Sequence, residues 1–158
     1  GSPVGGALVS NVPVEVALAG DERLVVPTDV IVRSARAGKE NARVSLVNDI
    51  RARETAVDIG PATIKNWSEE ISRAPFVLWN GPMGIYEDGF RDGTEALAEA
   101  LTKSSTRAVV GGGDTEAALA RFSFDRERVF VSTGGGAMLE FLASGTLLGI
   151  EALKDSRG

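Results

Sequence analysis

Two kinds of hydrophobic pattern alternate along the chain. Short apolar runs rich in β-branched residues predict strands, and longer stretches in which apolar residues recur every three or four positions predict amphipathic helices. From Arg43 onward the two kinds follow one another, which is typical of βαβ units around a parallel sheet. We therefore predict one α/β domain with a mainly parallel sheet and no internal linker.

The first predicted strand, residues 23–32, carries Pro27 between β-branched residues. Proline cannot donate to a strand ladder, so we expect a bent or edge strand rather than a regular central one. The runs at residues 43–48 and 55–60 predict two more short strands. The proline that opens the next segment suits a first helical position, and apolar residues at helical spacing predict a helix over residues 61–73.

The second half of the chain contains a repeated layout. A buried strand at residues 74–84 runs into a glycine-proline turn, and Thr94 stands ahead of an alanine- and leucine-rich helix. Two consecutive units then read strand, three glycines, helix, with the glycines at Gly111–Gly113 and Gly134–Gly136. In a parallel sheet both turns lie at the carboxyl ends of their strands, the edge where open α/β folds bind ligands.

Glycine turns before helices are suited to binding phosphate. A helix start has unpaired N–H groups and a partial positive charge, and glycine removes the Cβ atoms that would keep an anion away. Asp114 fits two roles, a helix cap and a ligand for Mg²⁺, and Thr115 can add a hydroxyl. Tight helix packing is the competing explanation for one such turn, and the presence of two turns weakens it. Neither turn fits G-x-G-x-x-G, and no P-loop motif occurs.

The segment WNGPMG is a third feature. A structural turn with Trp79 in the core would explain it. Alternatively, Pro82 and Met83 offer an apolar surface for a base, and Glu87 can accept hydrogen bonds from ribose hydroxyls. A merely solvated acidic pair, Glu87 with Asp88, is the competing interpretation.

Composition narrows the chemistry. The chain of 158 residues has no cysteine and no histidine, which removes disulfides, thiolate ligands and the commonest general base. A net charge of −5 argues against nucleic acid, and no apolar stretch is long enough to span a membrane, so we expect a cytoplasmic protein. The chain opens without methionine, and we interpret residues 1–3 as a tag remnant.

Four motifs, in this order, closely resemble the C-terminal half of phosphoglycerate kinase, and the resemblance runs from about Leu24 to Leu153. They are DIGPATI at residues 58–64, WNGPMGIYE at residues 79–87, VVGGGDTEAA at residues 109–118 and STGGGAMLEFLASG at residues 132–145. The resemblance implies a Rossmann-like, three-layer α/β/α fold, here as residues 4–158 of an incomplete lobe of a two-lobe kinase. That lobe binds adenine nucleotide as MgATP or MgADP, and 3-phosphoglycerate binds only through the other lobe, which is missing from this chain.

The resemblance also assigns residues to roles. Pro82 matches the position that lines the base, and Glu87 the one that meets the ribose. Gly135 and Gly136 match the catalytic helix start that faces the transferred phosphoryl group. The phosphate-binding turn, with Asp114 as its metal ligand, corresponds to Gly112, Gly113, Asp114 and Thr115. Asp29, within VPTD, we interpret as structural.

Two departures from the family pattern stand out. Met138 replaces a small hydroxyl residue after the second glycine turn, and Leu148 replaces a proline in the tail. We expect the nucleotide-binding part of an enzyme that transfers a phosphoryl group between 1,3-bisphosphoglycerate and ADP in glycolysis, inactive as this chain alone. The alternatives are a non-catalytic nucleotide-binding module derived from that lobe and, disfavoured by the missing fingerprint, a dehydrogenase-like domain.

Overall fold

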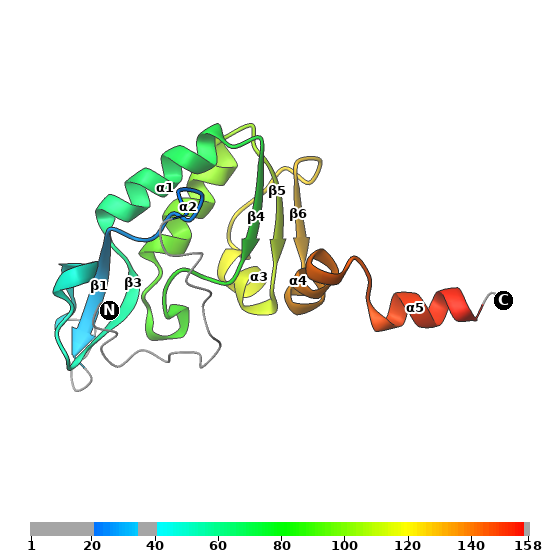
Figure 1. Cartoon of the computed structure of the whole chain (residues 1–158). Coiled ribbons are helices and arrows are strands. Elements are labelled where there is room, and N and C mark those ends of the chain that lie inside the picture. Colours follow the sequence, from blue (N-terminus) through cyan, green and yellow to red (C-terminus); the bar gives the residue numbers. More distant parts are fainter. Residues whose placement is uncertain (1–20, 35–40, 157–158) are drawn as a thin grey trace. The chain divides into compact units, whose positions relative to one another are not determined.

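The computed structural model describes residues 21–34 and 41–156 (Figure 1). The described residues divide into two compact units, one within residues 21–69 together with 83–97 and one of residues 70–82 with 98–156. Each unit carries its own three-stranded sheet. Residues 1–3 lie outside the described residues, and the assignment of residues 4–158 to one lobe stays a prediction.

The first unit is built on an antiparallel sheet of order β2-β1-β3. Val32 and Val57 are buried at its centre. Its elements are the strands β1 (Asp29–Ser34), β2 (Arg43–Leu46) and β3 (Glu54–Ile59) and the 3-10 helices η3 (Val47–Asp49) and η4 (Tyr86–Asp88). Two longer helices, α1 (Pro61–Arg73) and α2 (Asp92–Lys103), begin in this unit and end in the other.

Two sequence predictions are wrong for this sheet. β1 is the central strand of this sheet. Pro27 does not prevent this, because the strand begins at Asp29 and the N–H that proline lacks therefore falls outside the ladder. The strands are antiparallel rather than part of βαβ units. Residues 35–42 between β1 and β2 are too few for the long, usually helical crossover that joins parallel neighbours, and β3 also pairs with β1 in the antiparallel direction.

Buried aspartates at strand ends anchor the two long helices. The carboxylate of Asp29 accepts hydrogen bonds from the amides of Ala62 (3.0 Å) and Thr63 (2.7 Å) in the first turn of α1. Burial alone would raise the pKa of Asp29, but these bonds and one from the Thr63 hydroxyl lower it. Asp58 accepts in the same way from the amide of Gly93 (3.1 Å) at the start of α2. The structural role expected for Asp29 is therefore to bind the first amides of α1.

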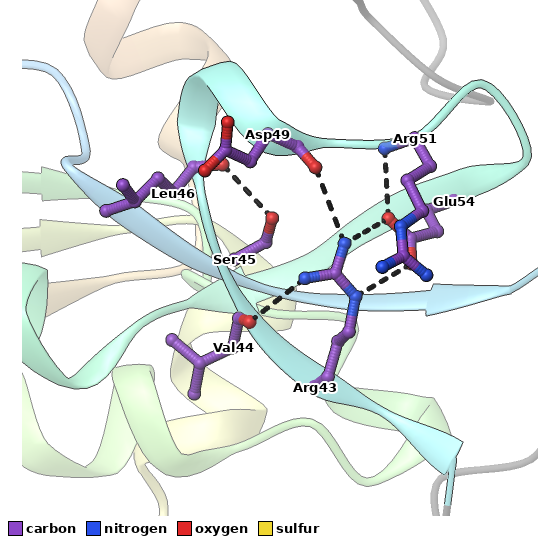
Figure 2. Close-up of polar contacts among 7 residues, drawn as sticks. All are labelled: Arg43, Val44, Ser45, Leu46, Asp49, Arg51 and Glu54. Atoms are coloured by element: carbon purple, nitrogen blue, oxygen red, sulfur yellow. Dashed lines mark hydrogen bonds and ion pairs between the residues drawn. The ribbon is translucent and has the colours of Figure 1, made fainter.

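A charged clip closes the connection between β2 and β3. Arg43 donates from Nε and Nη2 to the carboxylate of Glu54, at 2.9 and 2.7 Å, and the amide of Arg51 donates to the same carboxylate at 2.9 Å (Figure 2). Arg43 also donates to the carbonyls of Val44 and Asp49. One guanidinium thus holds both sides of residues 47–53.

The second unit contains a parallel sheet of order β4-β5-β6. Its buried residues include Trp79, Leu101, Val110 and Leu119. Its own elements are β4 (Phe76–Asn80), β5 (Arg107–Gly111), α3 (Gly113–Leu119), β6 (Val129–Ser132), α4 (Gly135–Ser144) and α5 (Leu148–Asp155).

The α/β class, the parallel sheet and both strand-glycine-helix units are confirmed. The helix over residues 61–73 is confirmed as well. α2, however, begins at Asp92, so Thr94 lies in its first turn rather than ahead of it. In the described part of the chain no single helix is long and apolar enough to cross a bilayer, although α4 and residues 148–154, which meet at a bend of 67°, pass that test of length and composition as a pair.

Candidate functional site

The two glycine turns lie side by side at one edge of the parallel sheet. β5 and β6 are paired in register from Ala108 with Val129 to Gly111 with Ser132, so both turns leave the sheet at the same carboxyl end. The amide of Gly112 donates to the carbonyl of Ser132 at 3.0 Å. This bond joins the turns directly, as expected for neighbouring parallel strands.

The structure gives internal reasons for two inner glycines of the turns. A Cβ atom on Gly135 would stand 2.6 Å from the amide nitrogen of Gly112, so close packing with backbone explains the absence of a side chain at Gly135. Gly112 has a φ of +105°, a conformation that favours glycine. A Cβ atom on Gly111 would stand 2.6 Å from the methyl carbon of Met138, which is the end of a flexible side chain.

The outer glycines have no such explanation. A Cβ atom on Gly113 or on Gly136 would meet nothing within 4 Å, and both residues are exposed. Each is the first or second residue of its helix, α3 or α4. Glycine at these two positions leaves the helix starts open on the side away from the protein.

The helix starts supply the donors. The amides of Gly113, Asp114 and Thr115 in the first turn of α3 have no intrahelical partner, and the same holds for the first amides of α4, from Gly135 onward. The amide of Gly112 is already bonded to Ser132. Gly112 therefore contributes its shape to the turn rather than its N–H.

Asp114 is not the helix cap. Gly112 occupies the cap position of α3, and no side chain caps that end. The carboxylate of Asp114 is exposed and bonds no residue that the structure describes. Among residues 21–34 and 41–156 no three acidic, histidine or cysteine side chains form a metal cluster. One exposed carboxylate beside unpaired helix-start amides could serve as a ligand for Mg²⁺. Mg²⁺ is usually bound through one or two carboxylates together with substrate phosphates.

Thr115 and the corner after β4 are tied together. Thr115 is fully buried, and its hydroxyl accepts a hydrogen bond from the amide of Gly81 at 2.9 Å. Trp79 is buried, as the structural interpretation expects, and its indole donates to the carbonyl of Gly81 at 2.6 Å. The corner that presents the half-buried Pro82 is therefore held against the start of α3.

Asn80 belongs to this group and was missed by the sequence analysis. Its Oδ1 lies 3.1 Å from the Cβ position of Gly112 and 2.6 Å from that of Gly135, so it stands at the junction of the two turns. In the sequence it stands only as one residue of the WNGPMG segment. Its position as the last residue of β4, one strand beyond the glycine turns, is the signal that could have found it.

Glu87 lies in the first unit, within η4, whereas the glycine turns lie in the second. Its side chain is exposed and pairs with no described residue, while its neighbour Asp88 forms an ion pair with Arg33 at 2.6 Å. The two members of the acidic pair are therefore not equivalent. The assignment of Glu87 to the same site as the turns stays a prediction.

A hollow of about 610 Å³ lies elsewhere in the second unit. The end of α3, the following connection and β6 surround it, with lining residues that include Leu119, Phe122, Phe124, Arg126 and Phe130. It is lined by none of the sequence-predicted site residues. Phosphate binding at the glycine turns stays a prediction.

The comparisons with a family model, with related sequences and with solved structures agree with one another. A family model described as phosphoglycerate kinase matches residues 10–145 and so begins ahead of Leu24. Phosphoglycerate kinase of Chlorobium phaeobacteroides is 46% identical over 136 residues, which are 84% of this chain and 34% of that protein. Phosphoglycerate kinase of Chlorobaculum tepidum is 42% identical and covers 98% of this chain and 42% of its own length.

Among solved structures, phosphoglycerate kinase from Coxiella burnetii superposes with a TM-score of 0.77 at 36% identity, over 91% of this chain and 39% of that one. The chain thus spans between about a third and two fifths of the relatives it matches.

Proposed function

Because the chain belongs to the phosphoglycerate kinase family, we propose that it is the adenine-nucleotide-binding part of a kinase that transfers a phosphoryl group between 1,3-bisphosphoglycerate and ADP. The relatives are phosphotransferases by name. A role in glycolysis and a location in the cytoplasm are part of this proposal, and the family resemblance supports them.

One observation carries the proposal. The outer glycines, Gly113 and Gly136, face open space, and packing among the described residues gives no reason for their lack of a side chain. They stand at two adjacent helix starts, whose free amides attract anions. A guest that needs close approach to both helix starts accounts for them, and a polyphosphate has the charge and the length to do so.

We assign the donors accordingly. The amides of Gly113, Asp114 and Thr115 bind the phosphates of the nucleotide, with Gly112 shaping the turn. Gly135 and Gly136 at the start of α4 face the phosphoryl group that moves. Pro82 lines the base, and the exposed carboxylate of Glu87 accepts from the ribose hydroxyls.

Asp114 would hold the Mg²⁺ that accompanies the nucleotide. When bound, that ion neutralises phosphate charge and fixes the positions of the oxygens. The chain's own part is to present one carboxylate that is unencumbered by a helix-capping bond. Phosphoryl transfer asks chiefly for positioning and charge stabilisation, so a site without histidine is chemically sufficient.

We further propose that this chain alone transfers nothing. The acceptor carboxylate of 3-phosphoglycerate is itself a nucleophile and needs no general base, but it must be held in line. We assign its binding to the part of the relatives that this chain does not span. The same partial span favours a second candidate, a non-catalytic nucleotide-binding module.

Titration calorimetry with MgADP and with NAD at equal ionic strength tests the proposal. We expect weak saturable binding of MgADP and none of NAD, because the turns lack a dinucleotide fingerprint. A coupled assay on the same sample should show no turnover of 3-phosphoglycerate with MgATP. Tighter binding of NAD than of MgADP would refute the assignment, and turnover would refute the inactivity of the chain alone.

A further inference from the structure

The turn that carries Glu87 is held from both sides. It follows Ile85, whose amide donates to the carbonyl of Val57 at 2.9 Å, and it ends at Gly89, whose φ of +83° closes η4. The amides of Asp88 and Gly89 donate back to the carbonyls of Ile85 and Tyr86 at 3.1 and 3.0 Å. Glu87 itself projects from this closed turn as an exposed residue.

Arg33 joins this turn to the sheet. Its guanidinium donates to the Asp88 carboxylate at 2.6 Å and also lies over the ring of Phe90, 5.3 Å from its centroid. Phe90 is buried. Arg33 lies on β1, where its backbone is in register with Thr55 of β3. One cation therefore fixes the residues on either side of Gly89.

The charge arrangement separates the two acidic residues. Asp88 is neutralised by Arg33, and Glu87 keeps a carboxylate that pairs with no described residue. A carboxylate free of cations accepts strongly from two neighbouring hydroxyl groups, whereas a paired one has lost part of that capacity. The ion pair thus leaves Glu87, among the described residues, as the less occupied of the two adjacent acids.

We propose that Arg33 is a positioning residue that reserves Glu87 for the ribose hydroxyls of the nucleotide by occupying Asp88 and fixing η4. This inference rests on the proposed function for the identity of the ligand. Its structural part, the ordering of η4 by Arg33, does not. Arg33 acts through Asp88 and touches no ligand.

The variant Arg33→Met removes the guanidinium and its charge and keeps an unbranched apolar side chain at this position. Partly exposed ion pairs contribute little to global stability, so the variant is expected to fold. Arg128→Met is a matched control, since the Arg128–Asp125 pair has side-chain exposures of 26% and 48% against 27% and 44% for Arg33–Asp88. Arg33→Lys restores a cation and should recover part of the effect.

The first readout is hydrogen exchange without ligand. Arg33→Met should raise the exchange rate at the amides of Asp88 and Gly89 by about tenfold, as expected when a charge-assisted bond is lost, and Arg128→Met should not. Unchanged exchange at both amides in Arg33→Met would overturn the inference, whatever the chain binds.

The second readout is the affinity ratio of MgADP to its 2′,3′-dideoxy analogue. We expect a preference of about tenfold for MgADP in the unmodified chain, lost in Arg33→Met and in Glu87→Gln and kept in Arg128→Met. Affinity for magnesium pyrophosphate should stay unchanged in every variant. A preserved preference in Arg33→Met, or an equal loss of pyrophosphate affinity, would overturn the inference. Failure of the unmodified chain to bind any of these ligands would contradict the proposed function instead.

Discussion

An added methyl group should have different effects on stability at the inner glycine Gly135 and at the outer glycine Gly136. At Gly135 it would overlap the backbone of Gly112, so Gly135→Ala should lower the free energy of unfolding by about 1–3 kcal/mol. At Gly136 it meets open space, so Gly136→Ala should change stability by less than about 1 kcal/mol, with the sign favouring alanine in a helix.

The variant Gly136→Ala, which should keep its stability, should lose affinity for MgADP. We expect MgADP binding to weaken by about tenfold, because the methyl group obstructs a charge-assisted hydrogen bond. Thermal unfolding and calorimetric titration on the same samples measure both. A Gly136→Ala chain that binds as well as the unmodified one would remove the reason for assigning phosphate to that helix start.

Asp114 is the second residue with a sharp prediction. Asp114→Ala should abolish the Mg²⁺ dependence of ADP binding and leave stability nearly unchanged, because the side chain caps nothing. Glu116→Ala, an exposed acid on the same helix, is the control and should keep that dependence. ADP titrations with Mg²⁺ and with EDTA measure the difference. Equal Mg²⁺ dependence in all three proteins would contradict the metal role.

Residue chemistry was predictable where a position in a motif determines it. The adjacency of the two turns and the burial of Trp79 follow from strand direction and hydrophobic pattern. The cap of α3 was not predictable, because a glycine at the cap position is as compatible with the sequence as Asp114. The partners of Asp29 and Asp88 lie far along the chain, so local patterns carry no information on them.

At the scale of elements, the clip between β2 and β3 gives the clearest dependence on pH. Hydrogen bonds from Arg43 and from the amide of Arg51 lower the pKa of Glu54 from 4.5 to about 2. A carboxyl whose folded pKa is depressed adds stability above its unfolded pKa, and this contribution disappears as the pH falls from about 4.5 to about 2.

Glu54→Gln should therefore be less stable than the unmodified chain at pH 7, and the difference should shrink as the pH is lowered through that window. Urea unfolding at a series of pH values measures it. Glu99→Gln, which breaks an exposed pair with Lys103, is the control and should show a much smaller difference. A difference independent of pH would show that the clip does not act through the charge of Glu54.

Elements were predicted better than their pairing. Helix α1 and the two glycine-linked units follow from proline, glycine and apolar spacing. The antiparallel order β2-β1-β3 was missed, because the hydrophobic pattern of a strand contains no direction and Pro27 suggested an edge that the structure does not have. The short connection between β1 and β2 was the available signal.

At the scale of the whole molecule, the residues that the sequence assigns to nucleotide binding are distributed over both compact units. The glycine turns, Asn80 and Pro82 lie in the second unit, and Glu87 lies in the first. The apolar residues Phe76, Leu78 and Phe130 are exposed on β4 and β6, the outer strands of the parallel sheet. We therefore expect purified samples to self-associate at high concentration, which sedimentation measures.

The most direct measurement is an amide NMR titration of the isotope-labelled chain with MgADP, at a concentration where sedimentation shows a monomer. We expect saturable shifts, all with one dissociation constant, at the amides of Gly113, Asp114, Thr115, Gly135 and Gly136. Shifts confined to the hollow around Phe122 and Phe124, or no shift at either helix start at saturation, would contradict it.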